Sequence, residues 1–560
     1  MTRCGNSSLE SNAADVLSRD FVTLEERTLG RVLARQASKF GDKTLITSVS
    51  GESVSYRELD QVSTRMAHGL AKLGVNFHEP VLVMLPDVID YIRLWCALSK
   101  RGAIEVPVNV TYRGRILTHV FNDSTARTIV VDRQYLDRVE EIADDLEHLE
   151  RCIIYSEDSV ERTNLQLPPR LAARCSAEPF ACLFSEETSP FEPMPAFHDL
   201  TLIIYTSGTT GPSKGVMVTH AHAFVEADVC AHELFSLESG DVSYSGGLPL
   251  FHIAGLTLFY QSVIAGSSMV LRKGYKNDYF WPDIAAHGCT VVGLIGAVGN
   301  FLWRQPPSAG DAKTPLRKVA MFPLIPEYRD FADRFGVEIS TSYGSTECPS
   351  PIVILANEAP PSVRCVGRPR REMDVRIFDE NDQERPIGEL GEICIRPKNN
   401  WEMMPGYWKR PDATAKAFRN FWYHTGDAGY QDAEGRFYFV DRLSDSIRRR
   451  GENVSSMEVE DEINSHPQVL ECAVFPVWAK ESEQEIMAAI VPKTGEAIDP
   501  VGLIRYLNRR MPYFMVPRYL EFASELAKTP SGKIQKYALR ENGVTLRTWD
   551  RVAVGLTLER

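Results

Sequence analysis

Short apolar runs alternate with helix-like stretches in the first part of the chain. Residues 81–86, 103–109 and 127–131 are apolar runs of strand length, whereas residues 29–40 and 88–100 repeat their apolar positions at helical spacing. Strands that alternate with helices are typical of a mostly parallel sheet with helices on both faces. The pattern therefore predicts an α/β fold with doubly wound, mostly parallel sheets.

Two other stretches have a different pattern. Residues 157–199 are rich in Pro and Glu and lack a clear period, which predicts a long surface excursion. Residues 366–396 consist of short strand-like runs separated by turns, which predicts a β-rich subdomain.

The pattern changes again near the C-terminal end. Two apolar runs, 469–478 and 485–493, are followed by a helix-like segment at 500–511. This stretch is long enough to form a separate small domain. We therefore predict a large N-terminal domain over residues 1–441 and a small α+β C-terminal domain over residues 442–560.

Composition and charge narrow the classes of function. The chain has 560 residues, which favours two or more domains. Its net charge of −13 argues against a nucleic-acid or anionic-membrane surface, because both need clustered Lys and Arg. No apolar run reaches the length of a membrane-spanning helix and no targeting signal is visible, so we expect a cytoplasmic protein. The eleven cysteines contain no Cys-x-x-Cys pair, which favours reduced, buried thiols over a zinc site.

A loop rich in Gly, Ser and Thr spans Tyr205–Gly215 directly after a predicted strand. Its glycines let the backbone approach a ligand, its hydroxyls can donate hydrogen bonds, and Lys214 adds a positive charge. These are the parts of a clamp for the phosphates of a nucleotide, in a spacing that differs from a Walker loop. The candidate phosphate-binding residues are Thr206, Ser207, Gly208, Thr209, Thr210, Gly211 and Lys214.

This loop resembles the signature of the adenylate-forming superfamily, which includes acyl-CoA synthetases, peptide-synthetase adenylation domains and beetle luciferase. Four further segments match that superfamily in order, up to residue 536. Segments 448–460 and 511–522 are most similar to bacterial carnitine/crotonobetaine-CoA ligase-like proteins. The resemblance implies that a carboxylic acid reacts with ATP and Mg²⁺ to give an acyl-adenylate, which coenzyme A then attacks.

The second matching segment is Ser342–Glu347. The resemblance implies that Tyr343 stacks on adenine, the Thr346 hydroxyl bonds the α-phosphate and Glu347 binds Mg²⁺, with Gly344 and Ser345 in the same nucleotide-binding turn. Each role suits its group, since a carboxylate is a preferred ligand of a hard cation. Without the other segments, we would interpret this one as an ordinary turn.

The third matching segment covers residues 423–427 and the fourth covers residues 529–536. The resemblance implies that Asp427 accepts hydrogen bonds from the ribose hydroxyls and that Arg442 supports the same sugar. It also implies that Lys533, in a Pro/Gly-rich loop, is the adenylation lysine. Such a cation is needed because a carboxylate must attack an α-phosphate that is itself negatively charged.

The fifth segment is the junction between the two predicted domains. The resemblance implies a hinge near residues 441–446, with Ser444 at the hinge position, about which a mobile small domain alternates between two half-reactions. Gly451 and Glu452 would then help to shape the tunnel for the thiol, and Arg448, Arg449 and Arg450 would meet the phosphates of coenzyme A. A solvated basic stretch is an equally good interpretation of Arg449 and Arg450.

The acyl pocket is the least defined part of the site. The resemblance implies that His252 lies near the reacting carboxylate and that residues 223–234, 293–300 and 348–352 complete the pocket. Relatives that activate α-amino acids have an Asp beside the Phe of this segment, to hold the substrate ammonium. Here Phe251 is followed by His252, which argues against an α-amino acid substrate. Because the pocket segments are mostly small or apolar, we expect an apolar acyl group.

Three other functions stay open at this stage. A stand-alone adenylation enzyme would load a carrier-protein phosphopantetheine arm, a luciferase-like oxygenase would share only the adenylation step, and a non-catalytic nucleotide-binding protein would perform neither. The intact Lys533, Glu347 and Asp427 argue against the last. The expected partners are therefore small molecules, namely the acid, ATP and coenzyme A, and a homodimer is left open.

Overall fold

The protein is described by a computed structural model that divides into two compact units. The first comprises Met1–Thr206, Pro212–Asp374 and Pro397–Lys416, and the second comprises Ser207–Gly211, Val375–Arg396 and Ala417–Arg560. The predicted boundary at residues 441 and 442 falls inside the second unit and stays a prediction. The residues that the structure describes are 22–158, 165–206, 213–246, 248–356, 358–443, 447–449, 452–454, 456–478, 484–511, 513–528 and 534–558.

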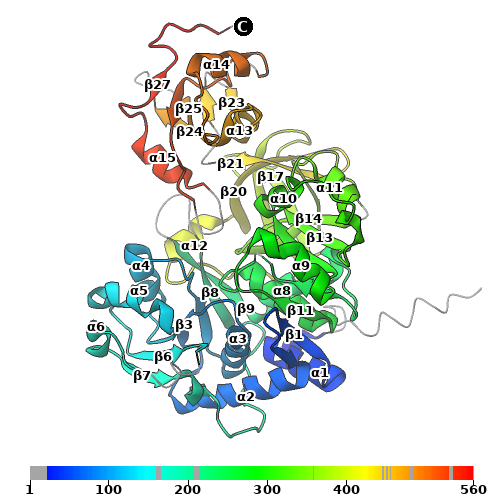
Figure 1. Ribbon diagram of the computed structural model, residues 1–560, viewed down its shortest axis with the longest axis vertical. Helices are drawn as coiled ribbons and strands as arrows, with labels where there is room; N and C mark the ends of the chain where they lie inside the picture. The colour runs from blue at the N-terminus through cyan, green and yellow to red at the C-terminus, as the bar shows by residue number, and fades with distance from the viewer. Residues whose placement is uncertain are drawn as a thin grey trace, which may run out of the picture. The chain divides into compact units, whose positions relative to one another are not determined.

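One sheet of the first unit is parallel except at one edge (Figure 1). Its strands run in the order β7-β6-β5-β3-β4-β8-β9, and only β9 is antiparallel to its neighbour β8. The central strands are buried on both faces, which explains their continuous apolar runs. The strands are β3 (Pro80–Met84), β4 (Ile104–Pro107), β5 (Thr128–Asp132), β6 (Arg151–Tyr155), β7 (Ser176–Pro179), β8 (Leu200–Thr206) and β9 (Lys214–Thr219).

A second sheet of this unit continues the α/β pattern and then becomes antiparallel. Its strands run in the order β2-β1-β11-β10-β12-β13-β14-β15-β16, with parallel pairs from β1 to β14 and antiparallel pairs beyond. The strands are β1 (Thr44–Ser48), β2 (Ser53–Ser55), β10 (Val242–Tyr244), β11 (Ser268–Leu271), β12 (Val291–Ile295), β13 (Lys318–Phe322), β14 (Glu338–Ser345), β15 (Cys348–Ile354) and β16 (Cys365–Pro369).

Helices cover these sheets, and their ends follow the local chemistry. Ser55 and Glu58 form a capping box at the start of α2, and Gly102 ends α3 with a left-handed φ of 72°. Among the described residues, no helix combines the length and the apolar character needed to cross a bilayer. The longer helices are α1 (Leu29–Phe40), α2 (Tyr56–Lys72), α3 (Ile89–Arg101), α4 (Gly114–Ser124), α7 (His220–Val229), α8 (Ile253–Ala265), α9 (Asn277–His287), α10 (Gly296–Trp303) and α11 (Tyr328–Phe335).

The region predicted as a long surface excursion is only partly irregular. Ser176–Pro179 forms the edge strand β7, which pairs with β6, and two short helical turns flank it. An edge strand is held by backbone hydrogen bonds on one side and needs no apolar alternation, so the sequence pattern missed it. The shorter helical segments of this unit are η1 (Leu24–Glu26), η2 (Arg133–Tyr135), α5 (Leu136–Glu141), η3 (Ala143–Asp145), α6 (Pro169–Ala172), η5 (Phe180–Leu183), η6 (Cys230–Leu234), η7 (Asp311–Lys313) and α12 (Pro411–Ala417).

The second unit contains the predicted β-rich segment and the C-terminal segment. In the latter, β24 and β25 are antiparallel, β25 and β26 are parallel, and α13 and α14 contribute to an apolar core with Val474 and Ile486. The elements are β17 (Met373–Phe378), β18 (Gly391–Pro397), β19 (Phe418–Arg419), β20 (Trp422–Gln431), β21 (Phe437–Arg442), β22 (Ile447–Arg449), β23 (Glu452–Val454), α13 (Ser456–Asn464), β24 (Val469–Trp478), β25 (Gln484–Pro492), α14 (Pro500–Asn508), β26 (Tyr519–Phe522), α15 (Lys536–Asn542) and β27 (Trp549–Asp550). The predicted fold class is confirmed.

A buried lysine joins α2 to α3. The Lys100 ammonium is 1% exposed and donates to Asp60 Oδ1 at 2.7 Å, to the Asp60 carbonyl at 2.7 Å and to Thr64 Oγ1 at 2.8 Å. The Asp60 side chain is 27% exposed, so water can still reach the carboxylate. The buried Lys100 ammonium therefore depends on Asp60 more than the partly hydrated Asp60 carboxylate depends on Lys100.

We predict that Asp60→Ala lowers the free energy of unfolding by about 3 kcal/mol, because it leaves a buried ammonium without its counter-charge. Lys100→Met, which leaves only a hydrated carboxylate, should cost less than half of that. Urea unfolding followed by tryptophan fluorescence measures both. Equal losses in the two variants would contradict the proposed asymmetry.

Candidate active site

The Ser342–Glu347 motif forms a hairpin in the first unit. Residues 342–345 end β14, Thr346 and Glu347 form the turn, and Cys348 begins β15 opposite Ser345. Thr346 is buried and Glu347 is half-buried. Gly344 is required here, because a Cβ at this position would lie 2.7 Å from the Ser350 nitrogen. The hairpin thus holds a hydroxyl and a carboxylate side by side at one turn.

Tyr407 connects this turn to the phosphate loop. Its hydroxyl donates to Glu347 Oε1 at 3.1 Å, and the Lys214 ammonium lies 4.4 Å from the centroid of its ring. Backbone bonds fix the segment that carries it, from Met404 N to the Glu347 carbonyl at 3.0 Å and from Trp408 N to the Gly215 carbonyl at 2.7 Å. The structure therefore brings Lys214 and Glu347 to the same aromatic ring.

Sequence reasoning missed Tyr407. Its position depends on how the segment from residue 397 to 416 returns to β9, where Tyr407 forms an isolated bridge with Val216. No local period or motif marks such a long-range contact. The local signal was an aromatic residue directly after Gly406, which is too common to select.

Helix α4 contacts both ends of the phosphate loop. The Tyr205 hydroxyl donates to Asp123 Oδ2 at 2.8 Å, and His119 Nε2 lies 2.7 Å from the Ser213 carbonyl. Thr206 and Lys214 are paired where β8 and β9 meet the loop. The predicted loop residues Ser207, Gly208, Thr209, Thr210 and Gly211 lie outside the described residues.

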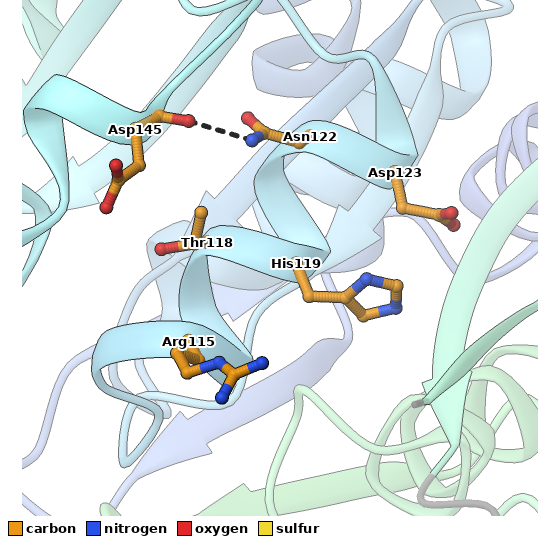
Figure 2. Close-up of a pocket in the computed structure, with 6 residues that line it drawn as sticks. All are labelled: Arg115, Thr118, His119, Asn122, Asp123 and Asp145. Carbon is orange, nitrogen blue, oxygen red and sulfur yellow. Dashed lines mark hydrogen bonds between the residues drawn. The ribbon is translucent and has the colours of Figure 1, made fainter. Parts of the chain in front are cut away.

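An open pocket of about 400 Å³ borders this helix (Figure 2). Its side chains carry both signs of charge, and Asn122 donates to the Asp145 carbonyl at 2.8 Å across it. Two of the residues that line it are those that contact Tyr205 and Ser213, so its wall also supports the phosphate loop. The lining residues are Arg115, Thr118, His119, Asn122, Asp123 and Asp145.

Asp427 and Arg442 form a pair in the second unit. They are cross-strand neighbours on β20 and β21, and Arg442 Nε lies 2.8 Å from Asp427 Oδ1. The Asp427 side chain is 7% exposed and that of Arg442 is 43% exposed. The structure therefore brings these two predicted residues together, with the carboxylate held by the guanidinium.

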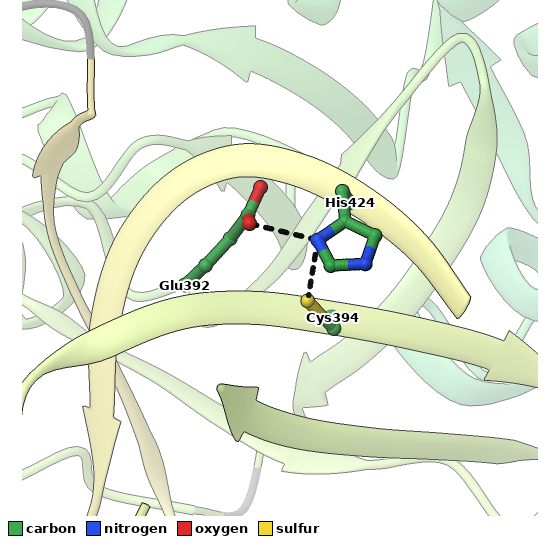
Figure 3. Close-up of side chains that lie close together, drawn as sticks. All are labelled: Glu392, Cys394 and His424. Carbon is green, nitrogen blue, oxygen red and sulfur yellow. Dashed lines mark hydrogen bonds and ion pairs between the residues drawn. The ribbon is translucent and has the colours of Figure 1, made fainter. Parts of the chain in front are cut away.

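A cluster of potential metal ligands lies beside Asp427 (Figure 3). His424 Nδ1 is 2.8 Å from Glu392 Oε2 and 3.3 Å from Cys394 Sγ. However, the Arg419 guanidinium lies 2.9 Å from the same nitrogen and 3.6 Å from Glu392, and burial raises the pKa of the Cys394 thiol. A fixed cation and a protonated thiol both disfavour a metal ion at this position. Glu392 instead accepts from Gly426 N at 2.9 Å, which supports the turn before Asp427.

His252 is exposed and caps α8. Its Nδ1 accepts from Ala254 N at 3.2 Å, so the neutral ring has its proton on Nε2. This bond gives the residue a structural role, and its predicted place near the reacting carboxylate stays a prediction.

The remaining predicted residues belong to the second unit. The backbones of Arg448 and Glu452 lie in the β22–β23 hairpin, whereas Lys533, Ser444 and Gly451 lie outside the described residues. Arg449, weighed as a contact for coenzyme A, is instead buried against Glu485 at 2.8 Å and the carbonyls of residues 514 and 516. Its guanidinium therefore stabilises the small sheet.

Comparison with known proteins places this chain in a family. Residues 33–408 match the family model described as AMP-binding enzyme, and residues 458–533 match the AMP-binding enzyme C-terminal domain. The crotonobetaine/carnitine–CoA ligase of Salmonella typhimurium is 32% identical over 519 residues, which cover 90% of this chain and 97% of that protein.

Solved structures agree on the fold. ATP-bound MatB from Rhodopseudomonas palustris has a TM-score of 0.79 at 24% identity, covering 92% of this chain and 98% of that one. A fatty acyl CoA synthetase of Mycobacterium tuberculosis has a TM-score of 0.69 at 25% identity, covering 93% and 99%. The first likeness concerns the fold alone. Taken with the family models and the Salmonella relative, these matches confirm the predicted superfamily: the chain belongs to the AMP-binding enzymes, which are AMP-forming ligases.

Proposed function

We propose that the protein is an ATP-dependent acyl-CoA synthetase. In the first step an oxygen of the carboxylate attacks the α-phosphorus of ATP, the bond to the β-phosphate oxygen breaks, and acyl-AMP and pyrophosphate form. In the second step the thiolate sulfur of coenzyme A attacks the acyl carbon and AMP leaves with the bonding electrons. Family membership and the 32% identity to a CoA ligase support this reaction.

The main support for the proposal is the position of two charged residues around Tyr407. Lys214 lies over its ring, and Glu347 accepts a hydrogen bond from its hydroxyl. A triphosphate needs positive charge beside its outer phosphates and, through a carboxylate, a divalent cation. Lys214 supplies the first. Glu347 fits the second, because it is a half-buried carboxylate at a turn that also presents the Thr346 hydroxyl. Mg²⁺ bound there would offset charge on the phosphates.

Other residues take the remaining parts of the nucleotide. Asp427 is proposed to accept from the ribose hydroxyls, with Arg442 fixing the orientation of its carboxylate at 2.8 Å. Tyr343, Gly344 and Ser345 are proposed to contact the adenosine. Thr206 and the loop residues that follow it are proposed to hold the phosphates.

The C-terminal residues are proposed to serve the two steps separately. Lys533 would offset the repulsion between the carboxylate and the α-phosphate in the first step. Arg448, Gly451 and Glu452 would serve coenzyme A in the second, with the change between them at a hinge near Ser444. These roles rest on the motif resemblance.

The proposed reaction leaves the carboxylic acid to be identified. The Salmonella relative is named for crotonobetaine and carnitine, and that name describes the relative. A cytoplasmic location and a homodimer also stay predictions.

The proposal is tested with a panel of carboxylic acids, read by release of AMP and pyrophosphate with and without coenzyme A. We expect acid-dependent exchange of pyrophosphate into ATP without coenzyme A, and thioester formation only when coenzyme A is present. Transfer to a phosphopantetheine carrier protein but not to coenzyme A would favour the carrier-loading alternative. No exchange with any acid would contradict the proposal.

Lys533→Ala should lower the rate of acyl-AMP formation by a factor of about 100–1000, because it removes a charge that acts in the first transition state. Thioester formation from supplied acyl-AMP should change little. The matched control is Lys536→Ala, since Lys536 already binds Ser456 Oγ at 2.7 Å and Glu460 at 2.8 Å. Equal loss in both half-reactions would contradict the role of Lys533.

Tyr407→Phe should raise the KM for MgATP about tenfold, because it removes a hydrogen bond to a charged group but keeps the ring beside Lys214. Steady-state kinetics at several Mg²⁺ concentrations measures this. Tyr438→Phe, which removes a similar bond to Asp432 at 2.9 Å, is the control and should leave the KM unchanged. An unchanged KM in Tyr407→Phe would show that this bond does not position Glu347.

A further inference from the structure

Helix α7 carries a carboxylate in a region expected to be apolar. Glu226 Oε1 accepts from Ser350 Oγ at 3.3 Å, across from α7 to β15. Its second oxygen, Oε2, is buried and has no hydrogen-bond partner among the described residues. Buried polar atoms are paired in most folded proteins, and leaving one unpaired is unfavourable. This oxygen therefore calls for a donor that the described residues do not supply.

The partner of Glu226 is held in an uncommon conformation. Ser350 has a φ of 35°, in the left-handed region that non-glycine residues seldom adopt. Arg370 fixes that backbone, since its Nε donates to the Ser350 carbonyl at 2.7 Å and its NH2 group to the Pro349 carbonyl at 3.1 Å. Strained residues cluster at ligand sites, where the surrounding structure holds them in place. The hydroxyl of Ser350 is thus oriented toward Glu226 at a conformational cost.

The charge around Glu226 is only partly compensated. Burial raises the pKa of its carboxyl from 4.5 to about 7, while the charge of Arg370 and the Ser350 bond act in the opposite direction. The Arg370 side chain is inaccessible to solvent, and two further carboxylates lie near its NH1, Glu372 at 3.8 Å and Glu233 at 4.0 Å. One guanidinium is therefore the shared counter-charge of three carboxylates.

Hydroxyls connect Glu226 to the reacting end of the site. Ser350 Oγ lies 3.1 Å from the Oγ of Ser342, the residue before Tyr343 in the nucleotide motif. Ser350 is the third residue of β15, which begins directly after the turn that carries Thr346. An acid whose carboxylate reacts beside Thr346 can therefore place its far end near Ser350 and Glu226.

We propose that Glu226 is a specificity-determining residue that selects carboxylic acids with a hydrogen-bond donor, a hydroxyl or an amine, at the end distant from the reacting carboxylate. The inference rests on the proposed function. It replaces the expectation of a fully apolar acyl group. A pocket that pairs a buried acceptor with a substrate donor discriminates far more strongly than one that only fits an extra methylene.

The test compares acids that have the same number of non-hydrogen atoms and differ only at the far end, as an ω-hydroxy, ω-amino or ω-methyl group, over several chain lengths. The kcat/KM for AMP release in the wild-type enzyme should be at least about tenfold higher for one donor-ended acid than for its methyl partner. The hydroxy and amino arms identify which donor is used. A preference for the methyl partners at every length would overturn the proposal.

Two variants assign that preference to Glu226. Glu226→Leu should reduce the ratio between donor-ended and methyl-ended acids to about one, and Glu226→Gln should at least halve it where the donor is an amine. Glu233→Gln is the matched control, because Glu233 is a second carboxylate near Arg370, at 4.0 Å, and its ratio should be unchanged. A donor preference that persists in Glu226→Leu would overturn the proposal.

Two further measurements keep the outcomes separate. Thermal unfolding of each variant with and without MgATP shows whether it is folded, and the wild-type comparison of acids can overturn the proposal without any variant. AMP release with methyl-ended acids alone would overturn this inference but support the synthetase. No AMP release with any acid would instead contradict the synthetase itself.

Discussion

The candidate site of the first unit depends on the phenol ring of Tyr407. Lys214 and Glu347 have opposite charges, and a direct ion pair between them would neutralise both. The ring gives each a separate partner, its face for the ammonium at 4.4 Å and its hydroxyl for the carboxylate at 3.1 Å. A cation over an aromatic ring keeps its full charge, and the interaction contributes about 0.5–2 kcal/mol. The lysine and the carboxylate thus stay available for a nucleotide and a metal ion.

The segment around Tyr407 is fixed before any ligand binds. Backbone bonds join Met404 to the Glu347 carbonyl and Trp408 to the Gly215 carbonyl, so both charged residues are tied to one short stretch of chain. A comparable arrangement supports Asp427, whose preceding turn is held by Glu392. In both units, residues outside the motifs hold the motif residues in place. Such support reduces the reorganisation needed when charge develops during reaction.

The sequence predicts what has a local signature. The buried strands β3, β4 and β5 were visible as apolar runs, and the hairpin residues Thr346 and Glu347 as part of a motif. Tyr407 was not, because its contacts join residues nearly two hundred positions apart, as β9 and the Tyr407 segment show. Arg449 was misjudged for the related reason that a basic run looks solvated until its carboxylate partner, Glu485, is located in space. Contacts of this kind depend on tertiary packing rather than on local sequence.

The surroundings of Glu226 also depend on tertiary packing, and they change the expectation that the acyl pocket is apolar. In the sequence it is one of two acidic residues, with Asp228, in a helix of mostly small and apolar residues, and an acidic side chain on a helix is most often solvated. Packing against β15 instead half-buries the side chain, buries its Oε2 and gives it a hydroxyl partner in a strained backbone. A chain that required only an apolar pocket could carry an aliphatic residue at position 226 and avoid the cost of burying a carboxyl group. That cost is best explained if the missing hydrogen bond is completed by the substrate.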